Sequence, residues 1–354
     1  MTGYTRTQNV DLVNTMQVPV RARQVLDIHD LSTAFTDPDV QEHWLSDPAT
    51  LVVGGGSNIL FVSDSVNKVV RITAQAYGFE DEGDTVLVHA DAGMGLDECV
   101  RWTARQGWYG IERLAEIPGT VGAAPIQNVG AYGVQLSDVL ESVEVWDRHE
   151  RKRARWPAAD CGLSYRHSRF KEEPDRWLVL RVWLRLAKHR PSDWPPLDYP
   201  GVRAAAEEYA RNGRTDLSSL TPSDMVEIIT RVRRQKLPDW RSRAIGSLGS
   251  FFQNPIVERD QADRLLSEWP DMPSYPQEDE LLVKLSAGWL IERSGWRGRS
   301  EGSAGVYERH ALVLVNLGGA SGAALWQLAQ SVQADVLGKF GVRLKPEPLI
   351  YAEF

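Results

Sequence analysis

The stretch Ile117-Pro-Gly-Thr-Val-Gly-Ala-Ala-Pro-Ile-Gln-Asn-Val-Gly-Ala-Tyr-Gly133 is rich in glycine and contains no charged residue. A bulky planar ligand can reach the main chain only where side chains are small or absent. Gln127 and Asn128 add amide groups that can pair with the edge of a heterocycle. Because 25% of the chain is charged, such a stretch is untypical of a solvated loop. We therefore expect it to form a wall around a large cofactor.

The composition indicates a globular protein of more than one domain. The chain has 354 residues, too many for one small core, and 42% of them are hydrophobic. The net charge of -8 argues against nucleic acid as a partner, which normally binds a basic domain. Cys99 and Cys161 lie in unrelated contexts, which excludes a thiolate metal site and argues against a disulfide framework. The start is polar and no apolar run is long enough to span a membrane, so we expect a cytoplasmic protein.

A second glycine-rich stretch, residues 54–58 (Gly-Gly-Gly-Ser-Asn), lies between strand-like segments. Residues 51–53 precede it, and residues 59–62 and 69–72 follow it, all rich in apolar and β-branched side chains. A Rossmann fingerprint or a P-loop would link a strand to a helix, and neither motif occurs. Successive main-chain N–H groups in this turn are suited to phosphate or pyrophosphate, whereas the alternative is a tight hairpin.

Helical periodicity predicts three helices. The residues that carry it are Leu96, Cys99, Val100 and Thr103 with a stop at Gly107; Met225, Ile228, Ile229 and Val232 after a Thr-Pro-Ser-Asp start at 221–224; and Leu325, Leu328 and Val332 within 323–337. This spacing favours a core role for Cys99 over a reactive thiol. Strands are expected at 141–146 and 177–186, followed by a short strand-like tail at the C-terminus.

Two connecting segments stand out by composition. The basic run 148–155 is expected to be an exposed turn, with a binding role as the alternative. Residues 191–200 form a proline-dense connector that contains Trp194 and Tyr199, and they mark a candidate boundary region.

Four single residues could carry chemistry, and each has an ordinary alternative. Arg166 lies in a cationic segment that also holds His167; its planar fork could grip a carboxylate, or the segment could be a solvated surface. Ser250 is a turn serine or a hydroxyl held in an apolar pocket as a proton donor, and no nucleophile-elbow motif surrounds it. Glu347 lies between prolines, and Lys236 ends a predicted helix, where the dipole favours a cation.

Taken together, these motifs occur in one order that resembles the MurB family, the UDP-N-acetylenolpyruvoylglucosamine reductases of bacterial cell-wall synthesis. The matching motifs are the two glycine-rich stretches, Ser-Tyr-Arg-x-Ser-x-Phe-Lys, Gly-Ser-Phe-Phe-x-Asn-Pro and the late Pro-Glu, and they run from about residue 51 to residue 348. Tyr199 in the connector resembles the longer, type I form of the family, in which a loop covers the substrate.

The resemblance implies an α+β fold with a two-part FAD-binding domain of the vanillyl-alcohol-oxidase type and a separate α+β substrate-binding domain. The implied boundaries are 1–73 for the first FAD subdomain, completed by 341–354, then 74–214 for the second FAD subdomain and 215–340 for the substrate domain. FAD would be bound non-covalently, because neither cofactor motif contains a histidine, and NADPH would be the co-substrate.

The resemblance also implies roles for individual residues. Cofactor contacts fall on Gly54, Gly55, Gly56, Ser57, Asn58, Ile117, Pro118, Gly119, Gly122, Ala123, Gln127, Val129 and Gly130. Substrate contacts fall on Tyr132, Tyr199, Lys236 and Asn254, and catalytic roles on Arg166, Ser250 and Glu347. Two residues depart from the family pattern: His167 replaces a common Asp, which affects the orientation of Arg166, and Ala123 replaces a hydroxyl, at a cost of ~1 kcal/mol in cofactor binding.

The implied reaction is reduction of UDP-N-acetylglucosamine enolpyruvate to UDP-N-acetylmuramate for peptidoglycan synthesis. Flavin N5 would deliver hydride to C3, Ser250 would protonate C2, and Arg166 and a protonated Glu347 would stabilise the enediolate-like intermediate. One alternative is a flavin oxidase of the same fold, which would not need all three residues. Another is a non-catalytic nucleotide-sugar binding protein. We expect a monomer that acts on a small UDP-sugar, with no metal, nucleic acid or membrane as a partner.

Overall fold

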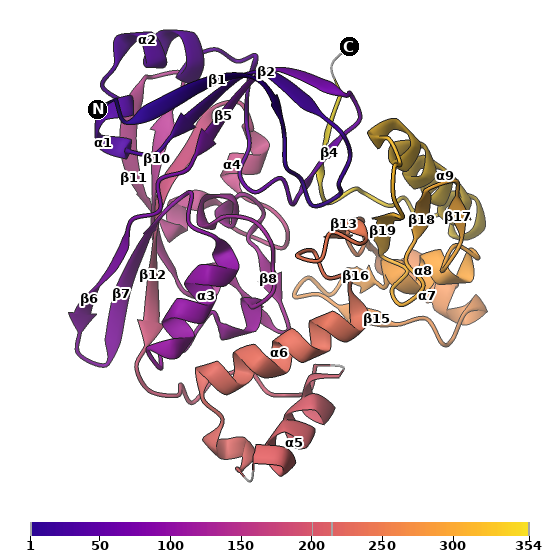
Figure 1. Cartoon of the computed structure of the whole chain (residues 1–354). Helices are drawn as coiled ribbons and strands as arrows, with labels where there is room; N and C mark the ends of the chain where they lie inside the picture. Colours follow the sequence, from indigo (N-terminus) through magenta and orange to yellow (C-terminus); the bar gives the residue numbers. More distant parts are fainter. Residues whose placement is uncertain (1, 200, 214, 353–354) are drawn as a thin grey trace. The chain divides into compact units, whose positions relative to one another are not determined.

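The computed structural model describes residues 2–199, 201–213 and 215–352 (Figure 1). Contacts between Cα atoms divide the chain into two compact units, each described by itself below. Unit 1 comprises Met1–Val10, Arg21–Gly55 and Val66–Gln235; unit 2 comprises Asp11–Val20, Gly56–Ser65 and Lys236–Phe354. The three domain boundaries expected from the sequence are not tested by this division and stay a prediction.

Unit 1 contains two larger sheets. The first has the order β1-β2-β5-β3, the second the order β11-β10-β12-β7-β6, and β8 pairs with β9. The second sheet is antiparallel throughout, whereas two strands of the first, β3 and β5, run parallel. The strands are β1 (Tyr4–Asp11), β2 (Arg21–Ile28), β3 (Thr50–Val52), β5 (Ser65–Ile72), β6 (Tyr77–Glu82), β7 (Thr85–Asp91), β8 (Gly130–Ala131), β9 (Val134–Gln135), β10 (Leu140–Asp147), β11 (Lys152–Pro157) and β12 (Trp177–Ala187). Along β7, alternate side chains are buried, which is typical of a strand with one face on a core.

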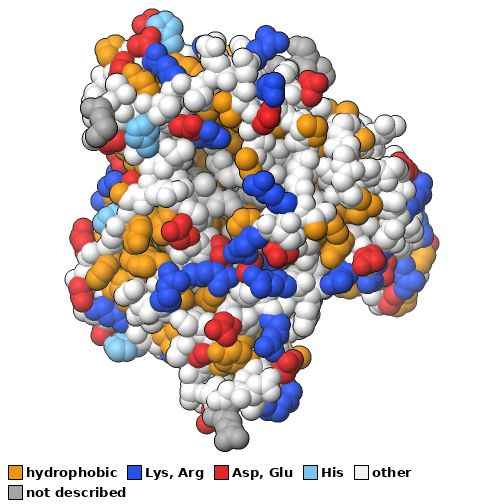
Figure 2. Space-filling view, viewed as in Figure 1, with side chains coloured by type: hydrophobic (Ala, Val, Ile, Leu, Met, Phe, Trp, Pro, Cys, Tyr) orange, Lys and Arg blue, Asp and Glu red, His pale blue; other side chains and the backbone are white. Residues whose placement is uncertain are grey.

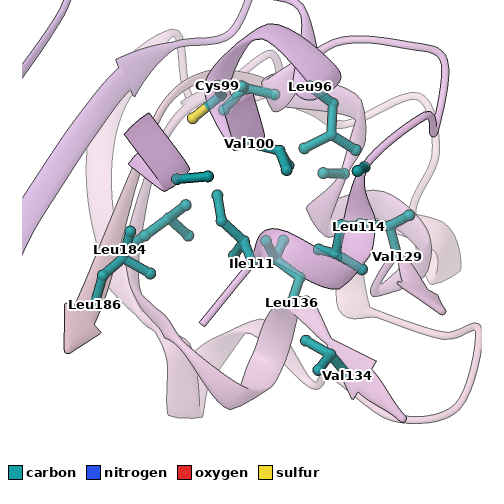
Figure 3. Close-up of a cluster of buried hydrophobic side chains, with 14 of the residues drawn as sticks. Leu96, Cys99, Val100, Ile111, Leu114, Val129, Val134, Leu136, Leu184 and Leu186 are labelled. Carbon is teal, nitrogen blue, oxygen red and sulfur yellow. The ribbon is translucent and has the colours of Figure 1, made fainter. Parts of the chain in front are cut away.

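The helices of unit 1 range in length from three to fifteen residues. They are α1 (Leu31–Ala34), α2 (Pro38–Val40), α3 (Leu96–Arg105), α4 (Arg169–Glu172), α5 (Val202–Gly213) and α6 (Pro222–Lys236), whose last residue belongs to unit 2. Figure 3 shows Leu96, Cys99 and Val100 of α3 turned toward Leu114 and Ile111 in a buried cluster. The predicted helix and the core role of Cys99 are therefore confirmed, and burial raises the pKa of the Cys99 thiol to about 12.

Unit 2 contains the remaining elements. The sheets have the orders β13-β19-β18-β17 and β14-β16-β15, and β4 pairs with β20. The strands are β4 (Ile59–Phe61), β13 (Gly246–Ser250), β14 (Ile256–Glu258), β15 (Ser274–Pro276), β16 (Leu282–Leu285), β17 (Ser300–Glu301), β18 (Ala304–Val306), β19 (Val313–Asn316) and β20 (Leu349–Tyr351); the helices are α7 (Arg259–Glu268), α8 (Ala287–Arg293) and α9 (Gly322–Phe340). The predicted late helix and C-terminal strand are confirmed.

The turn at residues 54–58 links two strands, as the sequence predicted. β3 ends before it and pairs in parallel with β5, whereas β4 begins after it and pairs in parallel with the C-terminal β20. The hairpin alternative is wrong, because the two flanking strands belong to different sheets. The turn therefore marks the point where the chain passes from unit 1 to unit 2.

The expectation of an exposed turn at residues 148–155 is confirmed only in part: residues 148–151 form a turn in which 149–151 are exposed, whereas the rest of the run is a strand and Arg148 is buried. Lys152–Pro157 forms β11, which pairs with β10. Arg148 is only 4% exposed, and its guanidinium donates hydrogen bonds to the carbonyls of Leu45 at 2.7 Å and Thr50 at 3.1 Å. A buried guanidinium is stable here because main-chain carbonyls of a distant segment satisfy its donors.

The proline-dense connector belongs to unit 1 and contacts residues 112 and 113 of the same unit. Trp194 donates a hydrogen bond from Nε1 to Glu112, and its ring lies 5.0 Å from the Arg113 guanidinium. Pro200, at the end of this connector, lies outside the described residues.

Charged side chains of both signs lie on the surface. Figure 2 shows several Lys and Arg side chains gathered near the middle of the visible face, with acidic side chains beside and around them. Within the residues that the structure describes, no helix has the length and apolar character needed to cross a membrane.

Candidate functional site

Residues 117–133, called the cofactor segment below, lie against the residues just before α3 through main-chain hydrogen bonds. Val121 N–H donates to the carbonyl of Met94 at 2.8 Å, and Gly122 N–H donates to that of Ala92 at 3.0 Å. A Cβ added to Gly122 would lie 2.4 Å from the Cβ of Ala92. The glycine is therefore required for packing, and the segment follows the main chain of its neighbour instead of looping into solvent.

The two glycine-rich stretches approach each other within unit 1. A Cβ on Gly55 would lie 2.9 Å from the Cα of Gly119, and one on Gly54 would lie 2.8 Å from Oγ1 of Thr120. Gly54 and Gly55 are nevertheless exposed. Backbone lined with small residues on two adjoining segments fits a phosphate-bearing cofactor, because main-chain dipoles can approach its oxygens without steric hindrance.

Contrary to our expectation, the Asn128 side chain is not available to pair with a heterocycle, because its amide is used within the protein. It is 1% exposed and has a left-handed φ of 45°. Its Nδ2 donates to Ser137 Oγ at 3.1 Å and to the Ser164 carbonyl at 3.2 Å, and its Oδ1 accepts from Ser137 N–H at 2.9 Å. The amide is used to hold the segment's own turn, which leaves Gln127, a half-buried residue, as the candidate ligand.

Arg166 lies at the tip of a tight turn. Ser164 and His167 exchange main-chain hydrogen bonds of 3.2 Å across it, and Arg166 has a φ of 54°. Its Nη2 donates to the carbonyl of Gly130 at 2.9 Å, which ties the guanidinium to the cofactor segment. The His167 ring lies 2.8 Å from Glu172 Oε1. The orientation of Arg166 is thus set by Gly130, although His167 replaces the usual residue beside it.

Tyr132 and Tyr199, the two predicted substrate tyrosines, lie together. Their ring centroids are 5.1 Å apart in an edge contact. Tyr132 is 7% exposed with a φ of 54°, and burial raises the pKa of its hydroxyl. Tyr199 is 47% exposed.

Arg113 holds both tyrosine-bearing segments and was missed from the sequence. It is completely buried, and Nη1 donates to the carbonyl of Tyr132 at 3.0 Å and to that of Pro196 in the connector at 3.1 Å. No local pattern distinguishes this arginine, because its partners are carbonyls brought in from elsewhere in the chain.

An ion-pair cluster supports the residue that precedes the cofactor segment. Glu116 is 4% exposed, and its Oε1 lies 2.8 Å from Nη2 of Arg101 and 3.2 Å from Nη2 of Arg234 on α6. Arg101 also contacts Asp97 at 2.7 Å and Thr230 of α6 at 3.1 Å. Side chains from α3 and α6 therefore hold the turn at Glu116, which has a left-handed φ of 64°.

In unit 2, Ser250 follows an irregularity in β13. The register with β19 shifts between Ser247 and Ser250, where Gly249 has a φ of 72°. Such bulges re-aim the following side chain. Ser250 itself is opposite Val313 and is half-buried.

The segment after Ser250 pairs with the segment that carries Glu347. Glu347 N–H donates to the carbonyl of Phe251 at 2.8 Å, and Gln253 N–H donates to that of Lys345 at 3.0 Å. Main-chain pairing around the antiparallel bridge between Phe252 and Pro346 thus brings two predicted catalytic positions from distant parts of the sequence onto neighbouring segments.

The other two predicted substrate residues, Asn254 and Lys236, belong to unit 2. Asn254 Oδ1 accepts a hydrogen bond from Ala287 N–H at the start of α8, 3.0 Å away. Lys236 ends α6, and burial lowers the pKa of its ammonium group.

Curated relatives match the chain over nearly its whole length. A UDP-N-acetylenolpyruvoylglucosamine reductase from Pseudomonas aeruginosa is 44% identical over 343 residues, covering 96% of each chain. One from Azoarcus is 41% identical over 356 residues, covering 97% of each. The chain belongs to the MurB family.

Family models agree with this membership of the MurB family. An FAD binding domain matches residues 46–151, and the C-terminal domain of UDP-N-acetylenolpyruvoylglucosamine reductase matches residues 241–351. A crystal structure of MurB from Thermus caldophilus, 23% identical, covers 99% of both chains with a TM-score of 0.63, which indicates a shared fold. The predicted fold class is confirmed, whereas the roles of individual site residues stay predictions.

Proposed function

We propose that this protein is an FAD-dependent, NADPH-consuming UDP-N-acetylmuramate dehydrogenase. It would reduce UDP-N-acetylglucosamine enolpyruvate to UDP-N-acetylmuramate, a peptidoglycan precursor needed for cell-wall biogenesis, cell shape and cell division. The observation that carries the proposal is the 2.8 Å hydrogen bond from Glu347 N–H to the carbonyl of Phe251, the residue next to Ser250, because it joins two chemically suited motifs. The 44% identity to the Pseudomonas aeruginosa reductase supports it.

The donor set of the two glycine-rich stretches fits FAD. Gly54, Gly55, Gly56, Ser57 and Asn58, with residues 117–119 and 122–123, would hold the pyrophosphate, and Gln127, Val129 and Gly130 would lie against the flavin. Bound non-covalently, FAD supplies the hydride chemistry between NADPH and C3 of the enolpyruvyl ether. The protein would supply the side chains that stabilise the developing negative charge, Arg166 and Glu347, and the proton donor, Ser250.

Arg166 would stabilise charge as it develops on the substrate carboxylate. Its guanidinium is oriented in advance by the Gly130 carbonyl at 2.9 Å, and a cation already in position costs no reorganisation during the reaction. Glu347 would bind the same carboxylate in its protonated form, because a second negative charge there is unfavourable.

Ser250 would donate the proton to C2. Serine is a weak acid in water, but an enediolate-like partner is a strong base, and a hydroxyl held on a β-bulge can be aligned with the reacting carbon. Tyr132, Tyr199, Lys236 and Asn254 would bind the UDP-sugar, with Lys236 as the cation for the diphosphate. We further propose a cytoplasmic monomer with FAD subdomains at 1–73 with 341–354 and at 74–214, and a substrate domain at 215–340.

The decisive experiment follows the flavin absorbance of the purified protein. We expect a yellow protein that NADPH bleaches anaerobically and that UDP-N-acetylglucosamine enolpyruvate reoxidises with formation of UDP-N-acetylmuramate. A colourless protein that binds the UDP-sugar would favour a non-catalytic binding protein. A flavin reoxidised by oxygen but not by the enolpyruvate would favour an oxidase.

A further inference from the structure

The segment Asp11–Val20 of unit 2 bridges the turn at residues 54–58, called the cofactor turn below, and β13, the strand that carries Ser250. Thr15 makes both connections through its main chain: its N–H donates to the carbonyl of Gly56 at 3.1 Å, and its carbonyl accepts from Ser247 N–H at 2.9 Å. Gly56 belongs to the cofactor turn, and Ser247 lies on β13 three residues before Ser250. One residue outside every site motif therefore connects the two.

Glycines on both sides permit this close approach. A Cβ on Gly56 would lie 2.6 Å from the carbonyl oxygen of Val13, and one on Gly246 would lie 2.1 Å from that of Met16. Because both contacts are with backbone atoms, flexible side chains cannot relieve them. The segment is thus packed main chain to main chain between the turn and β13.

Two buried asparagines hold the segment in shape. Asn14, 6% exposed, donates from Nδ2 to the carbonyl of Val18 at 2.9 Å and accepts from Val18 N–H at 3.2 Å. Asn316, 2% exposed, donates from Nδ2 to the carbonyls of Met16 at 3.1 Å and Gln17 at 3.2 Å. Buried amides with satisfied donors and acceptors fix a single geometry, because any other arrangement leaves a polar group unpaired.

Asn316 connects the Asp11–Val20 segment to β13. It lies on β19, where it is opposite Gly246 in the antiparallel pairing. The asparagine side chain therefore holds the bridging segment against the same strand whose end carries Ser250. The contacts form a ring through the segment, β13 and β19.

We propose that Asn316 is a positioning residue for proton transfer, which acts by holding the Asp11–Val20 segment so that the Ser250 strand keeps its place beside the cofactor turn. This inference rests on the proposed function, because it assumes that Ser250 protonates C2. It predicts that Asn316 affects the half-reaction that uses Ser250 and leaves flavin reduction nearly intact.

The test is a double-mutant cycle on Asn316→Ala and Ser250→Ala, with the two half-reactions measured separately by stopped-flow absorbance. We expect Asn316→Ala to retain FAD, to be reduced by NADPH within about threefold of the wild-type rate, and to be reoxidised by the enolpyruvate at least about tenfold more slowly, since a misplaced catalytic group reacts slowly. In the Ser250→Ala background, Asn316→Ala should change reoxidation by less than about twofold, because coupled residues are non-additive.

Gly246→Ala is a second variant, which disturbs the contact between β13 and Met16 from the β13 side. It replaces Asn316→Ala in the test if that variant does not fold. Gly305→Ala is the matched control: it lies on β18 of the same sheet, where the added Cβ would lie 3.2 Å from Ser300 Cβ. The control should react like wild type. Normal reoxidation of both Asn316→Ala and Gly246→Ala, or full additivity with Ser250→Ala, would overturn the inference. Normal reoxidation of Ser250→Ala alone would instead overturn the proposed role of Ser250, and the inference with it.

Discussion

Two segments of the candidate site are held by different kinds of contact. The turn at Glu116, which leads into the cofactor segment, is held by side-chain ion pairs from Arg101 and Arg234. The segment directly after Ser250 is held by main-chain hydrogen bonds of Phe251 to Leu312, at 2.7 Å, and to Glu347, at 2.8 Å. A side-chain substitution can therefore displace the first segment, whereas in the second it can remove chemistry and leave the geometry intact.

The largest effect should follow from Ser250→Ala, which tests the segment held by its main chain. Reoxidation of reduced flavin by the enolpyruvate should slow by about 10²–10⁴-fold, the range for loss of a general acid, with flavin reduction by NADPH nearly unchanged. The unfolding temperature should not move, because the strand hydrogen bonds remain. Stopped-flow absorbance measures both half-reactions, and Ser274→Ala on β15 is the control. Equal slowing of the two half-reactions would exclude the role of Ser250 as proton donor.

A large but smaller effect is expected for Arg166→Lys, which tests a turn tied to the cofactor segment by a side chain. A lysine cannot reproduce the planar fork that contacts Gly130 while binding a carboxylate, so kcat for the enolpyruvate should fall by about 10²-fold. Arg169→Lys in the neighbouring helix α4, with a side chain 43% exposed, is the matched control and should stay near the wild-type rate. Activity of Arg166→Lys within a few-fold of wild type would show that the arginine is only structural.

Glu116→Ala should separate stability from chemistry. It removes a buried carboxylate between two guanidinium groups, and we expect the free energy of unfolding to fall by about 1–3 kcal/mol, with weaker FAD retention. The control, Glu208→Ala, breaks the ion pair with Arg231, in which both side chains are more than 40% exposed, and should cost less than about 1 kcal/mol. Urea denaturation measures both. If the two variants lose equal stability, the ion-pair cluster does not hold the turn.

The smallest effect concerns pH and Lys236. Burial lowers the pKa of its ammonium group, so the positive charge is lost at a lower pH than the ordinary value of about 10.4. If this cation binds the diphosphate, KM for the UDP-sugar should rise a few-fold as pH increases from about 8 to 10. His310, whose pKa is also lowered by burial, carries no charge in this range. In Lys236→Arg the charge persists, so the rise in KM should disappear; the same rise in that variant would assign the titration to another group.

Local patterns in the sequence predicted the elements well. The helix at Leu96–Arg105, the strand-to-strand glycine turn and the C-terminal strand at Leu349–Tyr351 all follow from periodicity or turn chemistry within a short window. The errors concern partners. Arg148 lies in a basic run whose composition is typical of a solvated surface, but the residue is buried and donates hydrogen bonds to the carbonyls of Leu45 and Thr50. Asn128 looks like a ligand, but Ser137 and Ser164 use its amide.

Motifs in the amino-acid sequence identify the family, the cofactor class and the residue types available for the reaction, because the chemistry of each motif is local. The residues that support these motifs become visible only in the folded chain. The fold pairs the segment after Ser250 with the Glu347 segment, places Arg113 beneath Tyr132, and connects Gly56 to β13 through Thr15. These contacts escape sequence reasoning because hydrogen bonds and close packing join groups far apart in the chain, and no pattern within a short window encodes such a partner.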